Sequence, residues 1–169
     1  MGSTKRISSR TRLRRFLLFV ALTFSFGGFS VYAAVVVPVG SSVLDSTSQG
    51  FVTQKVTHFL NAFSAVTLLL LLWEVLEERR GRGPKANRTL ATLFIVLSCC
   101  CIALLQLHPR LDAMLAPESF SVERPTLFYR LHQVYLWVST VQWLASLALI
   151  WVLVSTWHAA DENAVSASP

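Results

Sequence analysis

Three of the four histidines are the side chains best suited to chemistry in this sequence. His58, His108 and His132 each lie near the end of a different apolar segment. Neutral imidazole is the commonest protein ligand for zinc, copper and haem iron, and it also carries protons. The histidine and cysteine spacing forms no HxxxH or CxxC motif that would specify a metal. The three imidazoles are therefore expected to meet only through the packing of the apolar segments.

Polar side chains recur along the last apolar segment. His132, Ser139 and Ser146 are seven residues apart, and Gln142 lies three residues after Ser139. At about 100° per residue, these four side chains share one face of a helix. Because a polar stripe that faces lipid is costly, we expect this face to contact other helices or to line a cavity.

A polar cluster near one membrane face is the candidate site. We predict that it consists of His58, Asn61, His108 and His132. Three interpretations stay open: a metal or haem site with the three histidines as ligands, polar contacts between helices, or a cavity that conducts a substrate or protons. Arg110 and Asp112 are loop candidates, either for recognition of an anion or as an ion pair in a solvated loop.

The remaining residues form no recognisable catalytic motif. The sequence has no Ser-His-Asp order, no pair of intramembrane carboxylates and no phosphate loop. The acid nearest to the interior of an apolar segment is Glu74, beside Trp73. Cys99, Cys100 and Cys101 are consecutive, so on a helix they point about 100° apart and cannot converge on one metal. We expect a protein that is not an enzyme and holds no cofactor, with haem or a transition metal as the alternative.

Four apolar segments must position these residues. About 20 apolar residues are needed to cross roughly 30 Å of hydrocarbon. We predict one membrane domain, residues 16–157, with spans at residues 16–39, 55–76, 89–107 and 127–157. The short polar connections between the spans predict an all-α, up-down-up-down four-helix bundle. Residues 1–15 are expected to form a basic cytoplasmic tail, and residues 158–169 a disordered cytoplasmic tail.

Basic residues are distributed unevenly about the predicted spans. The N-terminal tail and the middle connection together hold eleven of the 15 Lys and Arg residues, and the other side of the membrane holds four. The positive-inside rule therefore predicts cytoplasmic termini in a plasma or bacterial inner membrane. The two basic clusters are expected to contact anionic lipid headgroups, and no nucleic-acid interface is recognised. A homo- or hetero-oligomer is compatible with the sequence.

Small residues recur at a spacing of four in the first span, as at Thr23 and Gly27 and at Ser30 and Ala34. Small side chains at this spacing allow two helices to approach closely. We expect the first span to pack through this face, with Gly27 at the centre of the contact.

Two short segments resemble a known family. His108-Pro109-Arg110, with Met114 shortly after it, ends the third span, and residues 128–132 place Phe128, Arg130 and His132 at the start of the fourth. Residues 51–59 match more loosely. The chain resembles the small four-span membrane family that includes the human transmembrane protein associated with cisplatin resistance and its uncharacterised bacterial relatives. The resemblance implies a four-span fold and assigns no catalytic residue.

These features lead to two expectations for function. The first is a small integral membrane protein with a transport-associated or accessory role and a histidine-containing polar cluster near the outer leaflet. The alternative is a haem- or metal-binding four-helix membrane protein that acts in electron transfer or metal handling.

Overall fold

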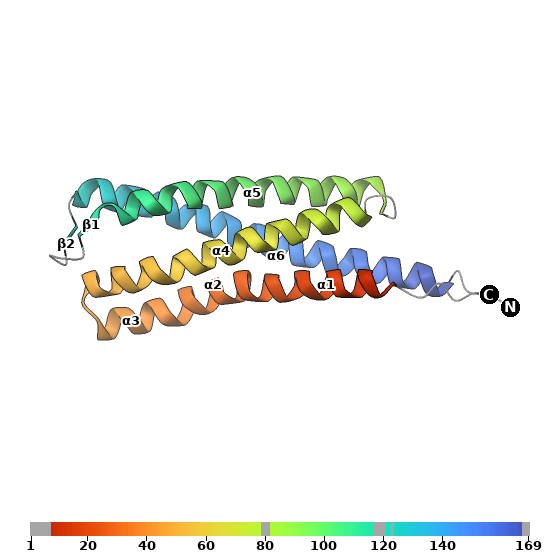
Figure 1. Ribbon diagram of the computed structural model, residues 1–169, viewed down its shortest axis with the longest axis horizontal. Coiled ribbons are helices and arrows are strands. Elements are labelled where there is room, and N and C mark those ends of the chain that lie inside the picture. Colours follow the sequence, from red (N-terminus) through yellow and green to blue (C-terminus); the bar gives the residue numbers. More distant parts are fainter. Residues whose placement is uncertain (1–7, 79–81, 117–120, 123, 167–169) are drawn as a thin grey trace.

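Four long helices lie side by side in a computed structural model that describes residues 8–78, 82–116, 121–122 and 124–166 (Figure 1). Each helix is long and apolar enough to cross a membrane, and the four candidate spans are Ser9–Val43, Ser48–Glu78, Pro84–Asp112 and Pro125–Glu162. Successive helices run in opposite directions (Figure 1). The protein is therefore an all-α four-helix bundle and a multi-pass membrane protein.

The first span is one continuous rod with two π-helical segments. It consists of α1 (Ser9–Leu22), η1 (Thr23–Gly27), α2 (Gly28–Val31), η2 (Tyr32–Val36) and α3 (Val37–Val43). The Val37 N–H donates to the Tyr32 carbonyl, five residues back, just before Pro38. A proline ring clashes with the carbonyl four residues earlier, and a wider π turn at that point accommodates it.

The other three spans are uninterrupted α-helices: α4 (Ser46–Glu78), α5 (Pro84–Asp112) and α6 (Pro125–Ser166). Pro84 and Pro125 occupy first helical positions, where a missing N–H removes no helical hydrogen bond. Asp45 precedes α4, and its carboxylate accepts hydrogen bonds from the Ser48 N–H and hydroxyl at 3.0 and 2.7 Å. Between α5 and α6, β1 (Leu115–Ala116) pairs antiparallel with β2 (Ser121–Val122).

The helices extend beyond the boundaries predicted from hydrophobicity. The first span begins at Ser9 rather than at residue 16, and α6 continues to Ser166. The predicted disordered tail is therefore helical as far as Ser166, while residues 1–7 and 167–169 lie outside the described residues. The extensions are held by side chains, since Arg15 Nη1 pairs with Asp161 Oδ1 at 3.0 Å. Hydrophobicity marks the part of a helix that suits lipid, not its full length.

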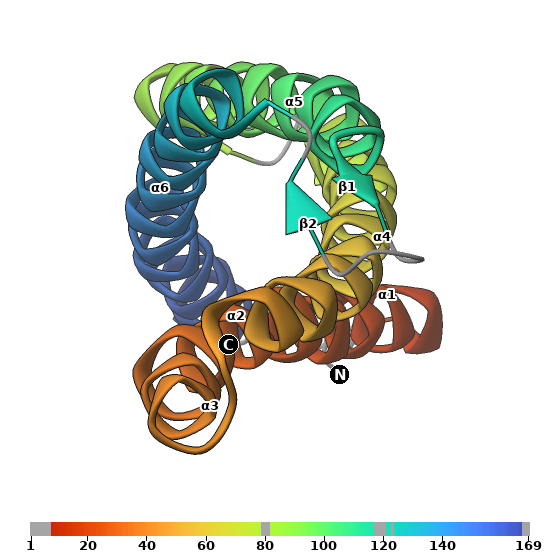
Figure 2. The ribbon, with the colours of Figure 1, turned by 90° about the vertical axis from the view of Figure 1, so that its left-hand side faces the viewer.

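The two ends of the bundle differ in character. We call the end that carries the start of α1 and the end of α6 the terminal end, and the opposite end, with the α3–α4 turn and the β1–β2 pair, the hairpin end (Figure 1). Seen from the hairpin end, α5 lies between α4 and α6, and the first span lies beside α4 (Figure 2). The larger buried core lies in the terminal half, and it is made of Leu18, Leu22, Leu71, Leu90, Leu97, Leu149 and Leu153.

The close contact between the first span and α4 lies at Gly28, one residue after the predicted position Gly27. A Cβ atom at Gly28 would lie 3.2 Å from Leu60 Cδ2 of α4, whereas a Cβ atom at Gly27 would meet nothing within 4 Å. The prediction that Gly27 is the centre of the packing is therefore wrong. The π turn of η1 changes the helical phase at this point, so spacing rules for a regular α-helix misplace the contact face.

Candidate functional site

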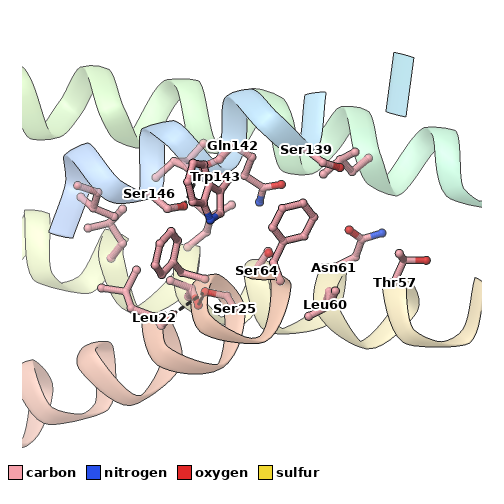
Figure 3. A pocket seen from close by; sticks show the side chains of 18 of the residues that line it. Leu22, Ser25, Thr57, Leu60, Asn61, Ser64, Ser139, Gln142, Trp143 and Ser146 are labelled. Carbon is pink, nitrogen blue, oxygen red and sulfur yellow. Dashed lines mark hydrogen bonds between the residues drawn. The ribbon is translucent and has the colours of Figure 1, made fainter. Parts of the chain in front are cut away.

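A cavity of about 50 Å³ lies between the helices near the middle of the bundle (Figure 3). Its polar wall on α4 comprises Thr57, Asn61, Ser64 and Thr67, whose spacing of three and four residues places them on one helical face. Other polar lining residues come from the first span and α6, and they are Ser25, Tyr135, Ser139, Gln142, Trp143 and Ser146. Three spans therefore contribute hydrogen-bonding groups to one mid-membrane space.

The polar stripe predicted on the last span lies only in part on this cavity. Ser139, Gln142 and Ser146 line it, and Ser139 is only 5% exposed. Figure 3 shows the Gln142 side chain of α6 directed toward the α4 wall. His132 is half-buried, and its ring stacks on Phe128 with centroids 5.9 Å apart. The aromatic residue one turn earlier in the same helix therefore contacts the imidazole.

Three of the cavity side chains have unused hydrogen-bonding capacity. Among the residues that the structure describes, no protein partner is found for the polar groups of Ser64, Ser139 and Gln142. The hydroxyls of Thr57 and Ser146, by contrast, donate to carbonyls of their own helices at 2.7 and 2.8 Å. Because an unpaired polar group inside a membrane protein is costly, these three side chains favour water or a polar ligand in the cavity.

A tyrosine connects the cavity with the hairpin end. Tyr135 is 7% exposed, and its hydroxyl lies 3.1 Å from Asn61 Nδ2 and 3.3 Å from Asn61 Oδ1, so it both accepts from and donates to the amide. The ring of Tyr135 lies 6.4 Å from that of His108, which lies 5.8 Å from the ring of His58. Polar and aromatic groups thus continue from the cavity toward the exposed His58.

The structure brings three of the four predicted cluster residues together. His58 and His108 face each other from α4 and α5, and Asn61 joins them through Tyr135. In the described part of the chain, the ring contact of His132 is with Phe128 and none is with His58 or Asn61.

The two loop candidates lie on the last turn of α5 rather than in a loop. Asp112 Oδ2 lies 3.4 Å from His108 Nε2, one turn away, while the Arg110 side chain is exposed. Within the described ranges, no group of three or more His, Cys, Asp or Glu side chains is placed to hold a metal ion.

A buried carboxylate organises the terminal end. Glu74 of α4 is 0% exposed. Its Oε2 accepts from Arg14 Nε at 2.5 Å, and its Oε1 accepts from Trp157 Nε1 at 2.9 Å and from Arg82. The carboxylate therefore ties together α1, α4, α6 and the connection before α5.

Further ion pairs surround Glu74. Arg14, 3% exposed, also donates to Glu78 Oε1 at 2.5 Å, and the Arg15 guanidinium stacks on the Trp157 ring at 5.4 Å. Burial lowers the pKa of Arg82 from its ordinary value, and the carboxylates of Glu74 and Glu78 act in the opposite direction. The sequence marks Glu74 as the acid nearest to an apolar segment but not its partners, because Arg14 lies among the basic residues of the predicted cytoplasmic tail.

A leucine layer separates the cavity from the Glu74 network. Leu22, Leu71 and Leu149 line the cavity and also belong to the buried core of the terminal half. Leu71 and Leu149 are 0% exposed, and Glu74 lies less than one turn beyond Leu71 on α4. The cavity is thus polar toward the hairpin end and closed by apolar side chains toward the terminal end.

Comparisons of this chain with models of protein families, with curated proteins and with solved structures find no match. The chemistry of the site therefore follows from its own residues.

Proposed function

We propose that this protein is a transport-associated membrane protein that admits small, uncharged polar solutes into its central cavity. The observation that carries the proposal is the unused hydrogen-bonding capacity of Ser64, Ser139 and Gln142 in the middle of the bundle. None of the described residues that line the cavity carries a charge. Hydroxyl and amide groups in apolar surroundings favour a neutral ligand with hydrogen-bonding groups of its own.

The cavity is large enough to hold water. A volume of about 50 Å³ exceeds the roughly 10–15 Å³ of cavity space that one water molecule needs. Water fits in this state, and a larger solute requires the spans to move apart. Movement of the first span away from α6 would have to break the hydrogen bond that Trp143 Nε1 donates to the Ser30 hydroxyl at 2.9 Å.

The orientation forms part of the proposal. The side of the membrane that holds both termini carries eleven Lys and Arg residues and the other carries four, which favours cytoplasmic termini in a plasma or bacterial inner membrane. In that orientation Tyr135 and the histidine pair lie between the cavity and the outside, where we expect the solute to enter, and the Glu74 network closes the cytoplasmic end. Exposed basic side chains at that end, such as Arg12 and Arg88, then contact anionic lipid headgroups.

Solute flux into proteoliposomes tests this function. We would measure osmotic swelling in glycerol and in urea, two small neutral polar probes. Vesicles with the wild-type protein should swell faster than empty vesicles, and Gln142→Leu should return the rate to that of empty vesicles. The control is Gln133→Leu, the same substitution at an exposed position of α6, which should keep the wild-type rate. Equal swelling of wild-type and empty vesicles would contradict the proposal.

A metal or haem site is the second candidate, favoured by the 5.8 Å separation of the His58 and His108 rings and by Asp112 beside His108. A visible-light spectrum and elemental analysis of purified protein test it, because haem absorbs strongly. A bound metal that disappears in both His58→Ala and His108→Ala, and remains in His158→Ala, would replace the solute proposal. His158 is the matched control because it is exposed and pairs with Glu162 at 3.2 Å.

A further inference from the structure

A second hollow lies between the first span and α6. This groove of about 170 Å³ is lined by residues that include Phe19, Thr23 and Gly27 of the first span and Ile150, Val154 and Trp157 of α6. Phe19 is 58% exposed and Val154 is 52% exposed, so the groove opens on the outer surface of the bundle. In a membrane-spanning protein that surface faces lipid acyl chains.

The backbone itself makes room for the groove. Thr23 and Gly27 are the first and last residues of the π segment η1, and a Cβ atom at Gly27 would meet nothing within 4 Å. The neighbouring Gly28, by contrast, is in close contact with Leu60 of α4. The space therefore follows from a missing side chain on the groove side of the helix.

Cationic groups lie at the terminal end of the groove. The Arg15 guanidinium stacks on Trp157, and its Nη1 pairs with Asp161 at 3.0 Å. Its Nε is buried and has no hydrogen-bond partner among the described residues. Arg12 is exposed, and seven residues separate it from Phe19, so it lies on the same helical face about 10 Å farther along the axis. The structure shows no acidic partner for Arg12 within the described ranges.

We propose that this groove binds one anionic phospholipid, with an acyl chain between the first span and α6 and the phosphate beside Arg12 and Arg15. The apolar lining fits a hydrocarbon chain, and the two guanidinium groups lie at the end of the span, where a headgroup lies. The lipid site is separate from the solute cavity, although both use Leu22 and Phe26 as wall residues.

Native mass spectrometry of the full chain tests the lipid site. The protein would be equilibrated in micelles with equal amounts of phosphatidylglycerol and phosphatidylcholine. The wild type should retain one phosphatidylglycerol per chain in preference to phosphatidylcholine. Gly27→Leu should fill the groove and remove the retained lipid. Gly50→Leu, at a second helical glycine with open space around it, is the matched control and should retain lipid as the wild type does.

Two further variants separate the chain from the headgroup. Thr23→Leu fills the groove from another position and should also remove the lipid. Arg12→Gln should lower the preference for phosphatidylglycerol about fivefold, the effect expected for one basic residue at an anionic surface, whereas Arg130→Gln, at an exposed position near the hairpin end, should leave it unchanged. Equal retention of the two lipids by the wild type would overturn the proposal. Lipid retention by both Gly27→Leu and Thr23→Leu would also overturn it. A lipid-free dimer of the wild type that Gly27→Leu disrupts would overturn it as well, because the groove would then bind a second copy of the chain.

Discussion

Glu74 shows how a single buried charge is made tolerable in an apolar bundle. Its carboxylate is fully buried, and it accepts hydrogen bonds from Arg14, Arg82 and Trp157. Transfer of an ion from water into a low-dielectric interior costs several kcal/mol, which only good pairing and further hydrogen bonds offset. Each partner comes from a different segment, so the network fixes how these segments meet at the terminal end.

Removal of the Glu74 charge is expected to destabilise the protein strongly. Glu74→Gln leaves the Arg82 guanidinium buried without its ion-pair partner and Arg14 paired with Glu78 alone, which should lower the free energy of unfolding by about 3–5 kcal/mol. The control is Glu77→Gln, whose side chain is 38% exposed in its pair with Arg10 and which should change stability by about 0–1 kcal/mol. Denaturant unfolding in detergent measures both. Similar values for the two variants would mean that the network contributes little.

The Tyr135 hydroxyl should contribute measurably through its bond to Asn61. Tyr135→Phe removes it and should lower the free energy of unfolding by about 1 kcal/mol, the usual size of a polar contact between membrane helices. Tyr129→Phe is the control, because Tyr129 is 63% exposed and should give no change. A double-mutant cycle with Asn61→Leu isolates the pair. The assignment fails if the Tyr135 and Asn61 effects are additive.

Sequence reasoning reached some of these residues and not others. The seven-residue spacing indicated the face of Ser139, Gln142 and Ser146 because a regular helix preserves that spacing. The same spacing also included His132. The stacking of His132 on Phe128 depends on side-chain rotamers, which sequence spacing does not specify. The partners of Glu74 could not be predicted, since 60 residues separate it from Arg14 and only the assembled bundle brings them together.

The first span illustrates what sequence patterns do and do not determine at the scale of an element. Hydrophobicity predicted the four spans, and the structure confirms the all-α bundle. The π segment η1 has no clear sequence signature, whereas η2 comes just before Pro38, and each segment shifts the helical phase. Small residues predicted a close helix contact in this region, but the shift places that contact at Gly28 and leaves Gly27 beside an open groove.

Substitution of the two adjacent glycines should therefore have different effects. Gly28→Leu forces extra atoms against Leu60 and should lower the free energy of unfolding by about 1–3 kcal/mol. Gly27→Leu meets open space and should not destabilise the bundle. Both replace a helical glycine, so the difference between them is independent of helix propensity. Thermal unfolding in detergent measures this difference. A larger loss of stability for Gly27→Leu than for Gly28→Leu would contradict the assignment of the close contact to Gly28.

The whole molecule is asymmetric along the membrane normal. Toward the hairpin end, the cavity is bounded by Tyr135, whose ring lies next to the His58–His108 pair. Toward the terminal end, the leucine layer and the Glu74 network close it. Side chains with hydrogen-bonding groups therefore lie on the hairpin side of the cavity, and apolar side chains and a buried ion-pair network lie on the terminal side. The proposed function and its direction both depend on this asymmetry.

Thiol labelling of a single cysteine at position 142 tests this asymmetry most directly. In a background in which Ala replaces Cys99, Cys100 and Cys101, Gln142→Cys would be exposed to a membrane-impermeant thiol reagent from either side of oriented vesicles. Trp151→Cys, at a lipid-facing position of α6 that is 76% exposed, is the negative control. This asymmetry predicts that the cysteine at position 142 reacts from the hairpin side and not from the terminal side. Reaction from the terminal side, or from neither side, would contradict it.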